Sequence, residues 1–120
     1  MSDNQLVTLS RQFAVDMIHL CDMMKSRGKT AALINQLLRC STSIGANIHE
    51  ANYASSKADF INKFQIALKE CYETDYWLNV FHEAEIISRE EFDHRNRQCS
   101  KIRRLLIASI TTAKQNSEGQ

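Results

Sequence analysis

The sequence has no proline and only three glycines among its 120 residues. Sheet proteins use such residues in their many turns, so this shortage argues against a β fold and favours a few long helices. The longest apolar run, 105–108, is far too short to span a bilayer. The first five residues lack the basic and apolar regions of a signal peptide. We therefore expect a helical, cytoplasmic protein without membrane association.

A strong net charge is also missing, since the formal charge at pH 7 is only +1. No global field then draws the protein to nucleic acid or to a membrane, and any such affinity must come from a local patch. The four cysteines lack C-x-x-C spacing, and each falls on a different predicted helix. Buried reduced thiols are the favoured interpretation, with a four-cysteine metal site in the bundle as the alternative. The cysteines are Cys21, Cys40, Cys71 and Cys99.

What the sequence does have is apolar residues at steps of three and four, which indicate helices and exclude strands. The pattern predicts a single domain, 1–120, with helices at about 5–25, 30–53, 57–84 and 89–116. Residues 1–4 and the polar tail after 116 are expected to lie outside regular structure. Short connections make neighbouring helices antiparallel, so the predicted fold is an all-α, up-down-up-down four-helix bundle.

Local signals mark the helix ends. Gly28 suits the left-handed residue that ends a helix, and Thr30 can cap the next one. Two serines precede an acid by three residues, Ser56 before Asp59 and Ser88 before Glu91, which is the pattern of a capping box.

The second helix carries its main apolar stripe on residues that repeat with the helical period. A second line of the same helix, which consists of Ala31, Ile34, Leu38, Gly45 and Asn52, lies beside that stripe, and the third helix has Ile66, Trp77 and Val80 off its own core stripe. A helix that is apolar on two sides is buried on two sides, so Leu38, Ile66, Trp77 and Val80 are predicted to contact another subunit. The alternative is a wide core with scattered exposed apolar residues. The main stripe comprises Leu33, Leu37, Cys40, Ile44, Ile48 and Ala51.

Catalytic motifs are missing. There is no Gly-x-Gly-x-x-Gly, no Walker loop and no nucleophile elbow. A di-iron bundle needs two Glu-x-x-His motifs, whereas this chain has one, Glu91 to His94, at a predicted helix start. No basic partner for the cysteines follows from helix spacing, and His49 lies off the core stripe. We therefore predict no catalytic residues, no metal and no cofactor; a metal-dependent enzyme remains the least favoured alternative.

Polar residues interrupt the apolar stripes of the second and third helices. Ser43 and Asn47 lie near the stripe of the second helix, and Thr74 and Asp75 lie at the edges of the third. Such groups need hydrogen-bond partners if they are buried. The favoured interpretation is a network that sets the register of the two helices; the alternative is a ligand site.

A basic run with no acid in it lies in the fourth helix. Arg97, Lys101 and Arg104 are spaced i, i+4 and i+7, so they form one exposed stripe that could neutralise phosphates. These three are the candidate nucleic-acid-binding residues, with Arg39 as a weaker candidate. The alternative is a solvated face that keeps the protein soluble. The whole run is Arg95, Arg97, Lys101, Arg103 and Arg104.

The segments 36–51 and 59–78 resemble a bacterial four-helix-bundle family related to 23S rRNA intervening-sequence proteins. The resemblance implies a protomer that assembles into a ring, often a homopentamer, and a genetic association with ribosomal RNA insertions. A distant relative is the accessory protein of diversity-generating retroelements, whose basic ring engages nucleic acid and reverse transcriptase. The matching residues in the first block are Gln36, Leu37, Arg39, Ser43, Ile44, Asn47, Ile48, Glu50 and Ala51. Those in the second block are Asp59-Phe60-Ile61, Ala67 to Cys71, Glu73-Thr74 and Trp77-Leu78.

Together, the residues and the resemblance predict a non-enzymatic homo-oligomer that binds structured RNA or a nucleic-acid enzyme through basic surface residues. The alternative is a protein-binding scaffold or accessory subunit that makes no contact with nucleic acid.

Overall fold

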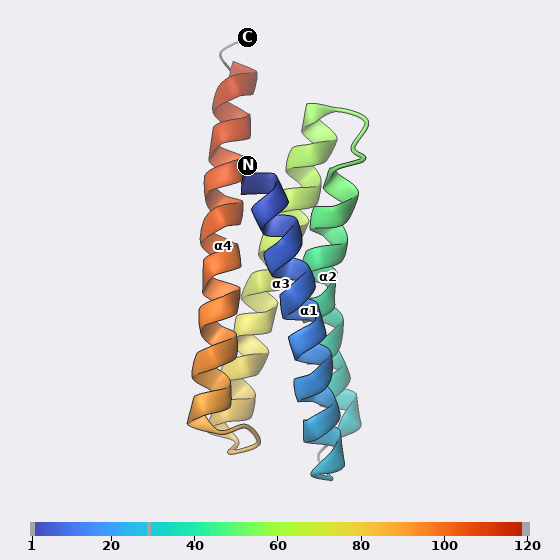
Figure 1. Ribbon diagram of the computed structural model, residues 1–120, viewed down its shortest axis with the longest axis vertical. Coiled ribbons are helices and arrows are strands. Elements are labelled where there is room, and N and C mark those ends of the chain that lie inside the picture. Colours follow the sequence, from blue (N-terminus) through green and yellow to red (C-terminus); the bar gives the residue numbers. More distant parts are fainter. Residues whose placement is uncertain (1, 29, 119–120) are drawn as a thin grey trace.

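Four helices make up the described part of the chain in the computed structural model (Figure 1). The structure describes the backbone of residues 2–28 and 30–118, and the side chains of 5–28 and 30–116. The four helices confirm the predicted all-α fold class. The helices are α1 (Ser2–Ser26), α2 (Ala31–Ala51), α3 (Lys57–Glu83) and α4 (Arg89–Glu118).

The helices form an elongated bundle of 54 × 22 × 19 Å. Figure 1 shows consecutive helices running in opposite directions, as the short connections require. Each helix packs against the next, and α4 returns to pack against α1. Within the described residues no contacts join the diagonal pairs, so each helix has two neighbours and one outward face.

Three of the predicted helix boundaries need correction. α1 begins at Ser2, so residues 2–4 are helical where we expected an irregular start, and α4 continues to Glu118. Polar residues alone do not stop a helix when no glycine or proline interrupts it. α2 ends at Ala51, because the amides of Asn52 and Tyr53 turn back to the carbonyls three residues earlier. The expected irregular positions Met1, Gly119 and Gln120 lie outside the described residues.

The predicted capping boxes at the starts of α3 and α4 are confirmed. Ser56 Oγ accepts a hydrogen bond from the Asp59 amide at 3.1 Å. At α4 the exchange is reciprocal: Ser88 Oγ accepts from the Glu91 amide at 3.0 Å, and Glu91 Oε1 accepts from the Ser88 amide at 2.8 Å. Thr30 occupies the N-cap position of α2 as predicted, but its side chain makes no capping hydrogen bond.

Two residues in the connections have left-handed backbones. Gly28 has a φ of 76°, as predicted for the residue that ends α1. Glu85 has a φ of 60°, which the sequence did not indicate because no glycine follows α3. It directs the Ile86 amide back to the Phe81 carbonyl at 2.8 Å, and this bond closes the end of α3.

The buried stripe of α2 differs from the predicted stripe at its first residue. Ile34 is fully buried, whereas Leu33, which was placed on the core stripe, is 43% exposed. Ile34 faces α1, where the Cys21 thiol lies 4.0 Å from its carbonyl. The second apolar line of α2 is therefore covered in part by α1 of the same protomer. On α1 itself, Ile18 lies outside the core and is 44% exposed.

Gly45 lets α1 and α2 approach closely. A Cβ atom at this position would lie 3.2 Å from the Ser10 carbonyl oxygen, tighter than ordinary van der Waals contact. Ser10 is buried and gives its hydroxyl hydrogen to the Val7 carbonyl at 3.3 Å, so it satisfies its donor locally. Ser10 lies four residues after Leu6 and three before Phe13, so helical spacing places it on the buried stripe although its side chain is polar.

Candidate nucleic-acid interface

The three predicted phosphate-binding residues lie together on the outward face of α4. Arg97, Lys101 and Arg104 are exposed, opposite the buried Ile102 and Leu106. None of the three forms an ion pair with any described residue. The acid of α4 that lies one turn before Arg97, Asp93, pairs with Arg89, and residues 94–117 contain no acid. We call Arg97, Lys101 and Arg104 the α4 basic stripe.

The other two arginines of the basic run point to the flanks. Arg95 turns toward α1, where it pairs with Asp16 at 3.4 Å and donates to Gln98 at 2.7 Å. Partial burial alone would raise the pKa of Asp16, but hydrogen bonds from Gln98 and Gln12 and the charge of Arg95 outweigh it and lower that pKa. The geometry therefore separates a structural arginine from the cations of the α4 basic stripe.

Arg103 turns toward α3 and lies over the ring of Tyr72, with its guanidinium carbon 5.8 Å from the ring centroid. This distance allows a cation–π interaction. Tyr72 is half exposed, and Tyr76, one turn further along α3, is 58% exposed. The sequence analysis did not assign a role to either tyrosine, although their i, i+4 spacing was a signal for a shared face.

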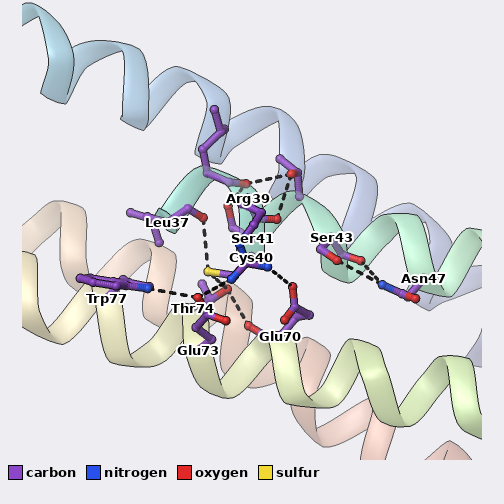
Figure 2. Close-up of polar contacts among 12 residues, drawn as sticks. Leu37, Arg39, Cys40, Ser41, Ser43, Asn47, Glu70, Glu73, Thr74 and Trp77 are labelled. Carbon is purple, nitrogen blue, oxygen red and sulfur yellow. Dashed lines mark hydrogen bonds and ion pairs between the residues drawn. The ribbon is translucent and has the colours of Figure 1, made fainter. Parts of the chain in front are cut away.

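Arg39, the fourth candidate, lies in a different environment. It donates to Glu70 at 3.0 Å and also to Glu73, both on α3 (Figure 2). The hydrogen bond from Arg39 lowers the pKa of Glu73, so this carboxylate stays charged. Trp77 adds a bond from its indole nitrogen to Glu73 at 3.3 Å. Two carboxylates offset the charge of Arg39, and we leave it out of the proposed RNA-binding surface.

Next to Arg39, a buried polar contact joins α2 to α3. Thr74 Oγ1 lies 3.3 Å from Cys40 Sγ and 2.8 Å from the Glu70 carbonyl (Figure 2). Burial raises the pKa of Cys40 to about 11, so its thiol is protonated and unreactive. We call Arg39, Cys40, Glu70, Glu73 and Thr74 the α2–α3 seam.

The polar residues of the sequence analysis do not form one network. Thr74 joins the two helices, but Asn47 bonds to Ser43 within α2, with 2.9 Å to its carbonyl and 3.1 Å to its hydroxyl. Asn79 bonds to the Asp75 carbonyl within α3 at 2.8 Å. Of these residues, Thr74 links α2 to α3, whereas Asn47 and Asn79 form their hydrogen bonds within their own helices; that polar contacts set the register stays a prediction.

The predicted subunit-contact residues are half-buried within the protomer. Trp77 packs against the core and stacks on Phe81, with ring centroids 5.8 Å apart. Leu38 also packs against the core, and the apolar line to which it belongs contacts α1 through Ile34 and Gly45. Contact of Ile66, Trp77, Val80 and Leu38 with another subunit stays a prediction.

The two remaining thiols of the bundle centre lie together. The Cys99 thiol lies 3.6 Å from the Cys71 carbonyl, and both residues are buried. Proximity to Cys99 and burial together raise the pKa of Cys71. Among the side chains of residues 5–28 and 30–116, no three from His, Cys, Asp or Glu gather closely enough to hold a metal ion.

A search of the described helices found none long and apolar enough to cross a membrane.

Comparison with known proteins agrees with this architecture. A crystal structure from Bacteroides thetaiotaomicron, of a protein of unknown function from the S23 ribosomal protein family, is 44% identical in sequence with a TM-score of 0.90. The alignment covers 92% of this chain and 99% of that one. No curated protein matches the chain. The sequence model of the 23S rRNA-intervening sequence proteins matches residues 2–108, which confirms the resemblance. The chain therefore belongs to the 23S rRNA-intervening sequence protein family.

Proposed function

We propose that this protein is a non-enzymatic homo-oligomer that binds structured RNA through the α4 basic stripe. The observation that carries the proposal is three exposed cations on one helix face, each without an ion-pair partner among the described residues. Cations that are not already neutralised can replace the counterions of a phosphate backbone. The family name, which refers to intervening sequences of 23S rRNA, makes RNA the first ligand to test.

Oligomerisation would multiply the effect of this small stripe. The α4 basic stripe of one protomer has three cations, and the net charge of the chain is +1. In a ring, the stripes of several copies would act on one RNA, and linked contacts raise the overall affinity without new chemistry. The partly exposed apolar residues Ile66, Trp77 and Val80 are the candidates for the subunit contact, and a homopentamer is the expected state.

The test is a fluorescence-anisotropy titration of a structured RNA at several salt concentrations. We expect affinity to fall as salt rises, with a log–log slope that decreases by about 1 for each stripe residue per bound protomer changed to Ala. The triple variant R97A/K101A/R104A should lose most binding and keep its helical circular dichroism spectrum. Lys25→Ala, at the end of α1, is the matched control because it removes one cation from another helix. Absence of binding by the unchanged protein at low salt would refute the proposal.

A protein-binding scaffold is the second candidate, favoured by the exposed edge of Trp77 and its neighbours. Light scattering at micromolar concentration distinguishes a contact between copies of this chain from a contact with a different protein at the surface around Trp77. A mass about five times that of the protomer supports the pentamer, and Trp77→Ala should then lower it. A monomeric mass would refute the oligomer and leave these residues for a different protein partner.

A further inference from the structure

α3 presents two tyrosine rings on one outward face beside the α4 basic stripe. Tyr72 and Tyr76 are 50% and 58% exposed, and neither hydroxyl bonds to a described residue. Four residues of helix rise about 6 Å, so the two rings lie one turn apart along α3. Tyr76 is held from behind by an edge contact with Trp77, with ring centroids 5.1 Å apart. The rings therefore form two neighbouring aromatic surfaces that face solvent.

The pairing of α3 with α4 sets the position of these rings relative to the cations. Cys99 contacts the Cys71 carbonyl, and the two helices run in opposite directions (Figure 1). Tyr72 consequently lies at a height between Arg97 and Lys101. Arg103 of α4 lies over the Tyr72 ring and so links α4 to α3.

The charge around the rings favours an anionic ligand. Lys69, one turn before Tyr72 on α3, is exposed and forms no ion pair with a described residue. Of the acids on α3, Glu70 and Glu73 pair with Arg39 toward α2, whereas the half-buried Asp75 bonds only to the neutral amide of Asn79 and Glu83 is exposed two turns beyond Tyr76. The surface thus combines exposed aromatic rings with cations that lack partners.

We propose that Tyr72 and Tyr76 stack against unpaired bases of the RNA whose phosphates contact the α4 basic stripe. This inference rests on the proposed function and names the part of the RNA that the protein binds. An exposed aromatic ring accepts any base, because every base has a π face, and bases are free to stack only where they are unpaired. The ligand is therefore a loop or bulge of a structured RNA, bound without sequence preference.

The experiment compares two RNA hairpins with the same stem and the same number of phosphates. One has a loop of ordinary nucleotides, and the other has abasic sites throughout its loop. We expect the full-length protein to bind the ordinary hairpin more tightly by anisotropy. Y72L and Y76L should each weaken that binding about fivefold or more and reduce the preference, because each loses one stacked base.

Three controls make the result specific. Y53L removes a tyrosine that is 78% exposed at the end of α2, and it should leave both affinities unchanged. Y72W retains an aromatic ring and should retain the preference even if a leucine variant folds poorly. The tyrosine variants should keep the salt slope of the unchanged protein, whereas R97A lowers it by about 1 for each bound protomer.

The outcomes separate the two proposals. Equal affinity for both hairpins, with salt-dependent binding that the tyrosine variants do not alter, would overturn base stacking and leave phosphate binding intact. Loss of the oligomer in Y72L or Y76L, measured by light scattering, would assign the rings to a protein contact and overturn the inference. No binding to either hairpin at low salt would overturn the proposed function and the stacking with it.

Discussion

Arginines on two faces of this bundle have opposite surroundings. At the α2–α3 seam, Arg39 meets Glu70 and Glu73, which the next helix presents one turn apart. On the outward face of α4, Arg97 and Arg104 form no ion pair with a described residue: Asp93, one turn before Arg97, pairs with Arg89, and no acid follows until after residue 117. The comparison shows that an arginine is paired or free according to the acids within its reach, both on its own helix and on the helix packed against it.

The largest expected effect comes from adding an acid to the α4 basic stripe, because this removes its difference from the α2–α3 seam. Ala108 is exposed and lies one turn beyond Arg104, so A108E places a carboxylate beside the last cation of the stripe. If the stripe binds phosphates, RNA affinity at low salt should fall about tenfold because of repulsion and the neutralised cation. A108Q is the matched control and should bind normally. An unchanged affinity for A108E would mean that the RNA does not contact this end of the stripe.

Removing the cation at the seam should have the opposite profile. R39A leaves Glu70, whose side chain is only 14% exposed, beside Glu73 without a counterion. We expect the free energy of unfolding in urea to fall by about 1 kcal/mol at pH 7, while RNA affinity is unchanged. R97A should change stability by less than about 0.5 kcal/mol. Equal destabilisation by the two variants would remove the distinction between the faces.

Acid should erase the stabilising effect of Arg39. Because Arg39 lowers the pKa of Glu73 below its ordinary 4.5 in the folded protein, this pair stabilises the fold above that value and stops doing so as pH falls through the lowered pKa. The difference in melting temperature between the unchanged protein and R39A should therefore be largest near neutral pH and shrink as pH falls below 4.5, the ordinary pKa of a glutamate. With E73Q in place of the carboxylate, the effect of R39A should depend less on pH. A constant difference across this range would contradict an ion-pair role.

The smallest expected effect comes from a residue outside both the α2–α3 seam and the α4 basic stripe. Glu85 has a left-handed backbone in the connection between α3 and α4, and glycine adopts that conformation without the steric cost of a Cβ. E85G should raise the unfolding free energy by about 0.5 kcal/mol, offset in part by the greater freedom of glycine in the unfolded chain. RNA affinity should not change. E85A, which keeps the Cβ, should show no such gain in a urea titration.

The sequence alone determined the number of helices, their order and most of their ends. Helical periodicity and serine–acid caps are local, so they act within a few residues and are legible without the fold. The same holds for the α4 basic stripe, because residues at i, i+4 and i+7 share a face of any helix. The boundary errors at Ser2, Ala51 and Glu118 arose where the chain lacks a sharp start or stop signal.

The tertiary structure decided which neighbour each face meets. Ile34 is buried and Leu33 is not because α1 packs on one side of α2, and Gly45 matters because the Ser10 carbonyl lies against it. Arg39 is paired, and Arg103 lies over Tyr72, through residues on α3 that are about thirty positions away in the chain. Such contacts depend on the rotation and height of one helix against another, which local sequence patterns do not specify.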